Sequence, residues 1–127
     1  MPNRLRITVG EVTATVVLND SPTAEAIWQA LPIQARANTW GEEIYFSIPV
    51  KMAEDNAQAV VTLGDVGYWP PGNAFCLFFG PTPMSQGSEI RPASPVNVVG
   101  RIEGDARAFR RVASGAKIAL EKTEGES

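Results

Sequence analysis

The sequence predicts a mainly β protein that folds as a closed, eight-stranded antiparallel β-barrel with two short helices. Apolar and polar residues alternate along most of the chain, which is typical of strands that bury one face. Glycine, proline and short polar stretches separate the alternating segments, and only two segments space their apolar residues as a helix does. Because side chains fill the interior of an eight-stranded barrel, we expect any binding site on its outer wall or rim.

The predicted strands are short and follow one another closely. The first two flank Gly10 and are predicted to form a hairpin. The stretch 64–83 organises the middle of the chain, since the stiff Pro70-Pro71-Gly72 corner joins two strands. The predicted strands are 5–9, 12–18, 33–37, 44–48, 59–66, 75–79, 96–102 and 116–120.

Both predicted helices begin at a capping residue. Ser21 can accept from the free backbone donors of the first helix, and Pro22 suits its first position. Asp105 plays the capping role in the second helix, which Gly115 is expected to terminate. The apolar stripes are Ala24, Ile27, Trp28 and Leu31 in the first helix and Ala106, Phe109, Val112 and Ala113 in the second.

The composition is that of one globular domain, predicted at 1–121 and followed by a flexible tail at 122–127. The 127 residues are 44% hydrophobic, enough to build one core in a chain of this size. With 11 basic and 14 acidic residues, the net charge of -3 leaves no basic surface for nucleic acid. No apolar run reaches the roughly 20 residues that cross a bilayer, and no signal-peptide core is visible, so we expect a cytoplasmic protein that binds no membrane.

Histidine is absent from the chain. A Ser-His-Asp triad, a Cys-His couple and a histidine-ligated zinc ion are therefore excluded. Cys76 is the single cysteine; without a histidine to activate it, we interpret it as a small apolar residue rather than a nucleophile. The residues thus predict no catalytic group, no metal site and no cofactor.

Two acidic pairs and one single acid are the candidates for acid–base or metal-binding groups. Glu42-Glu43 and Glu54-Asp55 are adjacent residues, which point to opposite faces if they lie on a strand. We therefore expect them on a solvated loop or edge. Asp65 lies between glycines, where a side chain that stabilises a turn is expected rather than a metal ligand.

The aromatic residues divide between the core and a candidate surface. Strict alternation places Phe75, Leu77 and Phe79 inside the barrel and turns Ala74, Cys76 and Phe78 outward. Trp28 and Trp40 are expected in the core. Tyr68 and Trp69, beside the proline corner, can either line a groove or pack against the barrel, and the sequence leaves both interpretations open.

Four segments, in the right order, resemble the cyclophilins. They are S-P-T-A-E-A-I-W-Q-A-L (21–31), G-E-E-I-Y-F-S-I-P-V-K-M (41–52), G-N-A-F-C-L-F-F (72–79) and V-N-V-V-G-R-I-E-G-D-A-R-A-F-R-R-V (96–112). The short loops and the block Y-W-P-P-G-N-A-F-C-L-F-F-G-P-T-P are similar to those of small bacterial and archaeal cyclophilin-like proteins of unknown function. The resemblance covers most of residues 5–121 and implies a barrel with a groove on its outer wall.

The resemblance also predicts what is missing. Cyclophilins use an arginine in G-x-x-F-H-R-x-x-P-x-F-M to weaken the resonance of the prolyl amide. Laid on residues 41–52, this pattern puts Tyr45 at the histidine, Phe46 at the arginine and Lys51 at the groove phenylalanine. Ala74 stands where a later glutamine is expected. Losing such a donor typically costs about 100-fold or more in rate, so little isomerase activity is expected.

We therefore predict a barrel without isomerase activity that binds a small molecule or a peptide in an outer aromatic groove. One alternative is a prolyl isomerase with a relocated arginine, from Arg36, Arg91 or Arg101; another is an interaction module that docks through the loop 80–95. Lys51 could supply charge in place of Arg36. The predicted groove residues are Arg36, Tyr45, Phe46, Met52, Trp69, Ala74, Cys76 and Phe78. Oligomeric state and ligand identity stay open.

Overall fold

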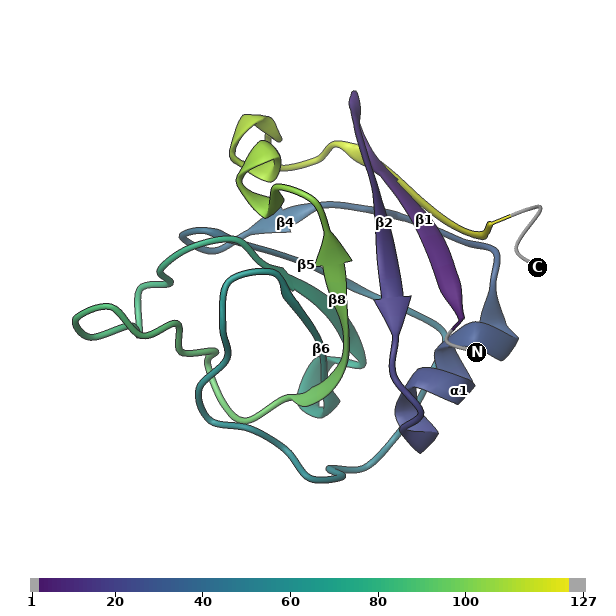
Figure 1. Ribbon diagram of the computed structural model, residues 1–127, viewed down its shortest axis with the longest axis horizontal. Helices are drawn as coiled ribbons and strands as arrows, with labels where there is room; N and C mark the ends of the chain where they lie inside the picture. The colour runs from purple at the N-terminus through teal and green to yellow at the C-terminus, as the bar shows by residue number, and fades with distance from the viewer. Residues whose placement is uncertain (1–2, 124–127) are drawn as a thin grey trace.

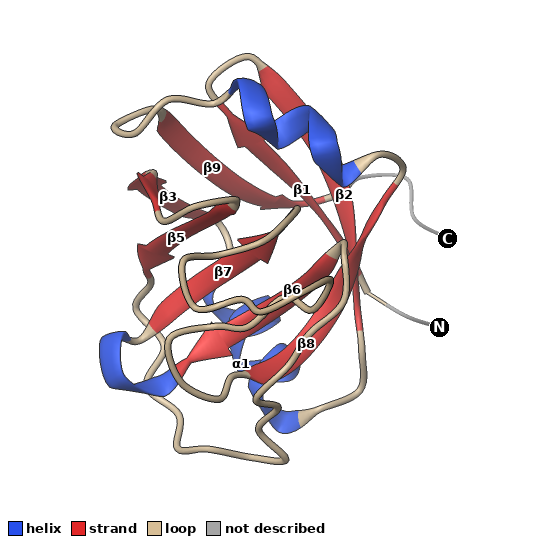
Figure 2. Cartoon of the chain, turned by 90° about the vertical axis from the view of Figure 1, so that its left-hand side faces the viewer, coloured by secondary structure: helices blue, strands red, loops and turns tan. Residues whose placement is uncertain are grey.

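The computed structural model describes residues 3–123, which form a mainly β fold around a single antiparallel sheet (Figure 1). Its nine strands follow the order β3-β9-β1-β2-β8-β6-β7-β5-β4 and curl into a nearly closed barrel (Figure 2). The predicted fold class is confirmed. The strands are β1 (Arg4–Val9), β2 (Val12–Leu18), β3 (Ile33–Arg36), β4 (Asn38–Thr39), β5 (Glu43–Ser47), β6 (Asp65–Trp69), β7 (Ala74–Phe78), β8 (Asn97–Glu103) and β9 (Lys117–Lys122).

The ninth strand arises where one extended segment changes partners. β3 pairs with β9, with Ile33 opposite Leu120, whereas β4 pairs with β5. Between them, Ala37 donates its N–H to Ala116 O (2.9 Å) and accepts from Gly115 N (2.7 Å). The segment 33–39 therefore joins the two ends of the sheet and closes the barrel. Counting β3 and β4 as one interrupted strand gives the predicted number of eight.

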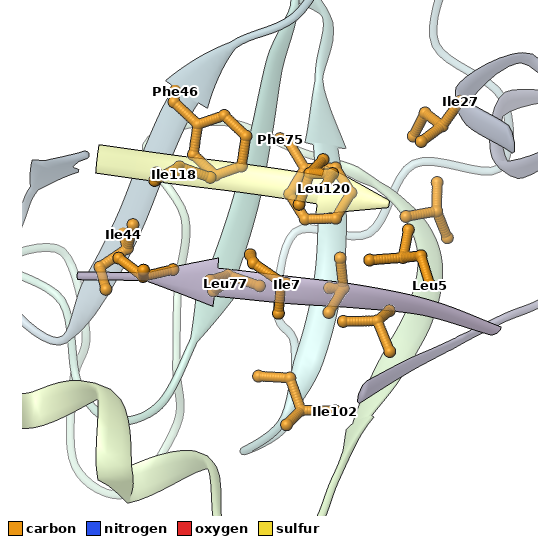
Figure 3. Close-up of a cluster of buried hydrophobic side chains, with 14 of the residues drawn as sticks. Leu5, Ile7, Ile27, Ile44, Phe46, Phe75, Leu77, Ile102, Ile118 and Leu120 are labelled. Atoms are coloured by element: carbon orange, nitrogen blue, oxygen red, sulfur yellow. The ribbon is translucent and has the colours of Figure 1, made fainter. Parts of the chain in front are cut away.

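The barrel interior is packed with apolar side chains (Figure 3). Alternation along β1 sends Leu5, Ile7 and Val9 inward, and all three are fully buried. On the opposite wall, the rings of Phe46 and Phe75 lie 5.3 Å apart. Helix α1 (Pro22–Ala30) contributes Ile27 to the same cluster. The interior predicted for Phe75, Leu77 and Phe79 is confirmed.

Both helices begin at the predicted caps. Ser21 Oγ accepts from Ala24 N at 3.2 Å, and Asp105 accepts from Arg107 N at 3.0 Å. The second helix is a short 3-10 helix, η2 (Ala106–Arg111), which ends before the predicted terminator Gly115. A further 3-10 turn, η1 (Pro70–Gly72), forms the proline corner between β6 and β7, as predicted for this stretch.

Two predicted segment boundaries were wrong. Residues 59–64 do not form a strand: isolated bridges, of Gln58 with Val96 and of Val61 with Ile90, join this part of the chain to its neighbours in place of a continuous ladder. The strand begins at Asp65, after Gly64 turns the chain with a φ of +90°. At the other end, β9 continues to Lys122, beyond the predicted 116–120. Of the predicted tail at 122–127, residues 124–127 lie outside the described part of the chain.

Asp65 stabilises a turn, as expected. It accepts from Thr62 N at 2.9 Å and pairs with Arg101 at 2.6 Å.

Within residues 3–123, none of the helices has the length and apolar character that crossing a bilayer requires.

Candidate functional site

Three neighbouring strands, β5, β7 and β6, present one continuous outer face (Figure 2). Tyr45 of β5 lies opposite Cys76 of β7, and Trp69 of β6 lies opposite Ala74. Since alternate residues of a strand share a face, Glu43 stands on the same outer face as Tyr45. Their strand neighbours, Ile44 and Phe46, point into the core. Sheet geometry therefore gathers side chains of different chemistry outside the barrel, among them Glu43, Tyr45, Trp69 and Cys76.

These side chains line a hollow of about 240 Å³ in the outer wall. Aromatic and apolar groups make most of its surface, and Glu43 contributes its single carboxyl group. The volume lies just below the roughly 300 Å³ at which small-molecule pockets usually begin, so it suits a head group or a side chain. The lining residues are Trp40, Glu43, Tyr45, Trp69, Cys76, Pro92 and Ala93.

The Trp69 ring is held in place from two sides. Its Nε1 donates to Ser94 Oγ at 2.6 Å, which ties β6 to the loop 79–96. Its six-membered ring lies over Gly72, where an added Cβ would approach Cζ3 to 2.8 Å. The wall that Trp69 forms is therefore fixed before any ligand arrives.

The loop 79–96, which extends from the barrel at the left of Figure 1, carries its own hydrogen bonds. Ser85 Oγ accepts from both Thr82 N (3.0 Å) and Arg91 N (3.1 Å), and Thr82 Oγ1 donates to Arg91 O. Ile90 packs into a small apolar cluster on the outside of β7. These contacts position Pro92 and Ala93 at the hollow.

Glu43 is the unusual group of the site. Its side chain is buried, with only 5% of the residue exposed. The neighbouring Glu42 is different, because its carboxylate forms an ion pair with Arg110. Burial raises the pKa of Glu43 from 4.5 to about 7, and the adjoining Cys76 thiol opposes that rise. No cation among residues 3–123 pairs with this carboxyl group. Near neutrality it therefore exchanges between its acid and its carboxylate.

Cys76 lies beneath Glu43 and is 1% exposed. Burial raises the pKa of the thiol well above its usual value, and the nearby Glu43 charge raises it further. The thiol also makes a long contact, 3.8 Å, with Ala74 O. A thiol kept protonated is a poor nucleophile, so its environment agrees with the interpretation of Cys76 as a small apolar residue.

The structure brings some of the predicted groove residues together and separates others. Tyr45, Trp69 and Cys76 line the hollow. Phe46 faces the barrel interior and Met52 packs against that core, so neither reaches it. The other three predicted residues do not line the hollow either. Ala74 and Phe78 are buried on the outside of β7, in an apolar cluster with Val61, Ile90 and Val96. Arg36 lies on β3 and donates to Gly115 O at 3.0 Å.

Sequence reasoning missed Trp40 and Glu43. Trp40 was expected in the core but is half-buried at the hollow, and Glu43 was expected at a solvated edge. A tight turn places both: Trp40 N donates to Glu43 O at 2.9 Å across Gly41, whose φ is +61°. The sequence did hold a signal for Glu43. If Ile44 faces the core, the alternation of a strand puts Glu43 on the outer face together with Tyr45.

Tyr68, left open between groove and packing, belongs to the core. Its hydroxyl donates to Val50 O at 2.6 Å and accepts from Met52 N at 3.1 Å. Trp28 also lies away from the hollow, with Lys122 Nζ 4.9 Å from its ring centre. The described chain thus keeps two of its tryptophans at the hollow and one outside it.

Comparison with known proteins agrees with this fold. A family described as cyclophilin-like matches residues 3–121. The solution structure of the hypothetical protein AF2241 from Archaeoglobus fulgidus is 45% identical, with a TM-score of 0.83, over 96% of this chain and 95% of that one. The structure of McbB in complex with tryptophan is 16% identical, with a TM-score of 0.68; it matches 97% of this chain but only 45% of its own, and the likeness concerns the fold alone. No curated protein matches the sequence.

The family match spans nearly the whole chain and coincides with the barrel described above. The resemblance first noticed in four sequence segments is confirmed, and the chain belongs to the cyclophilin-like family.

Proposed function

We propose that this protein is a binding member of the cyclophilin-like family, which holds a small organic molecule or a peptide side chain in the hollow outside β5, β6 and β7. The observation that carries the proposal is the hollow itself. Three aromatic rings and one buried acid converge there, from the segment 40–45 and from Trp69. An apolar pocket with few, well-placed polar groups is the usual form of a small-ligand site.

The arginines argue against prolyl isomerisation. Arg36 is bound to Gly115 O, Arg91 pairs with Glu89, and Arg101 pairs with Asp65. None of them lines the hollow. Isomerisation needs help across a barrier of about 18–20 kcal/mol, and a guanidinium directed at the prolyl amide is the group that cyclophilins supply for it. The proposal therefore assigns binding without isomerisation.

Tryptophan fluorescence tests the binding site directly. Trp40 and Trp69 line the hollow, whereas Trp28 does not. We expect compounds from a panel of amines, amino acids and short proline peptides to change the emission of the wild type and of Trp28→Phe. The panel includes tryptophan, the ligand in the McbB complex. Substitution of Trp40 and Trp69 together by phenylalanine should remove most of the change.

Two results would contradict the proposal. An unchanged emission spectrum across the whole panel, confirmed by calorimetry, would leave the hollow without a ligand. A protease-coupled proline-peptide assay should give the uncatalysed rate; isomerisation that Arg36→Ala abolishes would instead support the relocated-arginine enzyme. The variant Lys51→Ala is the control, because Lys51 is an exposed cation that does not line the hollow.

A further inference from the structure

We propose that the hollow recognises an organic cation, specifically an alkylammonium head group, with Glu43 as its counter-ion and the rings of Trp40, Tyr45 and Trp69 as its walls. This inference rests on the proposed binding function and names the chemical class of the ligand.

The walls have the chemistry that attracts a cation. An aromatic ring carries negative electrostatic potential on its faces, and an ammonium group within about 6 Å of a ring centre is attracted to it. Two of the three rings here are tryptophan, which attracts cations more strongly than tyrosine or phenylalanine. They come from β6, from β5 and from the turn before β5. A small apolar hollow of about 240 Å³ walled in this way accommodates one head group.

Glu43 is a buried acid that forms no ion pair with the described chain. Glu43 is 5% exposed, and among the described residues its carboxyl group bonds to the Cys76 thiol but forms no ion pair with a cation. A buried carboxylate is costly unless it is paired, because it loses its hydration. A ligand ammonium group would supply the missing positive charge inside the hollow.

Among residues 3–123, the cations that adjoin a lining residue of the hollow or its sequence neighbour are paired elsewhere. Tyr45 from β5 and Cys76 from β7 are the other titratable side chains that line the hollow. Arg91, beside Pro92 in the loop 79–96, is held by Glu89. Arg110 of η2 is held by Glu42, the residue before Glu43. The nearby cations are therefore paired elsewhere, and the charge of Glu43 is available to a ligand.

Recognition of this kind is coupled to a proton. An ammonium ligand binds the carboxylate and not the neutral acid, so binding releases the proton that Glu43 carries at low pH. With a pKa of about 7, the carboxylate fraction rises about tenfold between about pH 6 and about pH 8. Affinity for a quaternary ammonium probe, which has no proton of its own to lose, should rise by the same factor.

Choline and its neutral isostere, in which carbon replaces the quaternary nitrogen, form a matched pair of probes. Calorimetry and tryptophan fluorescence would give both affinities at two pH values. We expect choline to bind at least about tenfold more tightly than the isostere at about pH 8, and only choline to gain affinity with pH. Glu43→Gln should lower the affinity for choline by about tenfold or more at about pH 8 and remove its dependence on pH, with the ring contribution left in place, while the control Glu42→Gln should leave the affinity unchanged.

The outcomes separate this inference from the proposed function. Equal affinities for the two probes, or a choline affinity that does not change with pH, would overturn cation recognition and leave the hollow as a site for neutral ligands. Failure of choline alongside binding of other panel compounds would do the same. Failure of every compound would overturn the proposed function as well. The comparison of probes uses the wild-type protein, so it does not depend on whether Glu43→Gln folds.

Discussion

Replacing Glu43 with glutamine should stabilise the protein, and by an amount that depends on pH. Raising the pKa from 4.5 in the unfolded chain to about 7 in the barrel corresponds to about 3 kcal/mol, at about 1.4 kcal/mol for each tenfold change. Because the folded-state pKa is the higher one, the native protein holds the proton more tightly. The associated stability is complete below about pH 4.5 and is lost as the pH rises through about 7.

The assay is urea unfolding followed by far-ultraviolet circular dichroism, at about pH 5 and about pH 8. Glutamine cannot ionise, so the gain of Glu43→Gln over the wild type should grow by about 2 kcal/mol between these pH values. Any constant effect of the amide cancels in this difference. The absence of histidine leaves the interval free of the side chain that ordinarily titrates within it.

Two controls make the measurement decisive. Glu42→Gln removes the neighbouring carboxylate and its pairing with Arg110 but leaves Glu43 in place, so it should keep the pH dependence of the wild type. A nuclear magnetic resonance titration of the Glu43 carboxyl carbon should have its midpoint near pH 7. A gain that is the same at both pH values, or a midpoint near that of an exposed glutamate, would refute the reasoning.

Three other substitutions test the barrel and the wall of the hollow. Phe46→Ala should lower the free energy of unfolding by about 3–5 kcal/mol, because the fully buried ring packs against Phe75; a loss below about 1 kcal/mol in urea unfolding would place Phe46 outside the core. Gly100→Ala should cost about 2 kcal/mol or more, since an added Cβ would lie 2.3 Å from Val17 O; unchanged thermal unfolding would contradict that close approach. Ser94→Ala should cost about 1 kcal/mol and speed amide exchange in the loop 79–96, because it removes the bond from Trp69 Nε1; unaltered exchange would show that this bond does not hold the loop.

Alternation of apolar residues was the most reliable signal in the sequence. It predicted that Phe75 and Leu77 face the core and that Cys76 faces outward. In the structure, Phe75 and Leu77 belong to the barrel core, and Cys76 belongs to the separate cluster on the outside of β7. Helix starts were also predictable, because Ser21 and Asp105 act through bonds to residues only two or three positions away. Local chemistry fixes such features, so they need no knowledge of the rest of the fold.

The errors arose where a motif or a propensity outweighed this alternation. Matching a cyclophilin pattern to residues 41–52 placed Phe46 in the groove, although the inward-facing Ile44 already implied that Phe46 faces the core. The valines at positions 60 and 61 favoured a strand there. Only Val61 is bridged, to Ile90, and Val60 stays exposed, because this segment covers the outside of β7 rather than extending the sheet. Strand propensity does not distinguish a covering segment from a strand.

The burial of Glu43 could not be predicted from the sequence pattern around it. Alternation could assign its side chain to the outer face, but its burial depends on Trp69, 26 positions later, and on Pro92 in the loop 79–96. A cost of about 3 kcal/mol is a substantial part of the roughly 5–15 kcal/mol that stabilises a typical domain. Glutamine has nearly the same shape and would not bear that cost at neutral pH. An acid that pairs with no cation of the described chain and is surrounded by aromatic rings therefore has no structural advantage over its amide, and this is the physical ground for assigning its charge to a ligand.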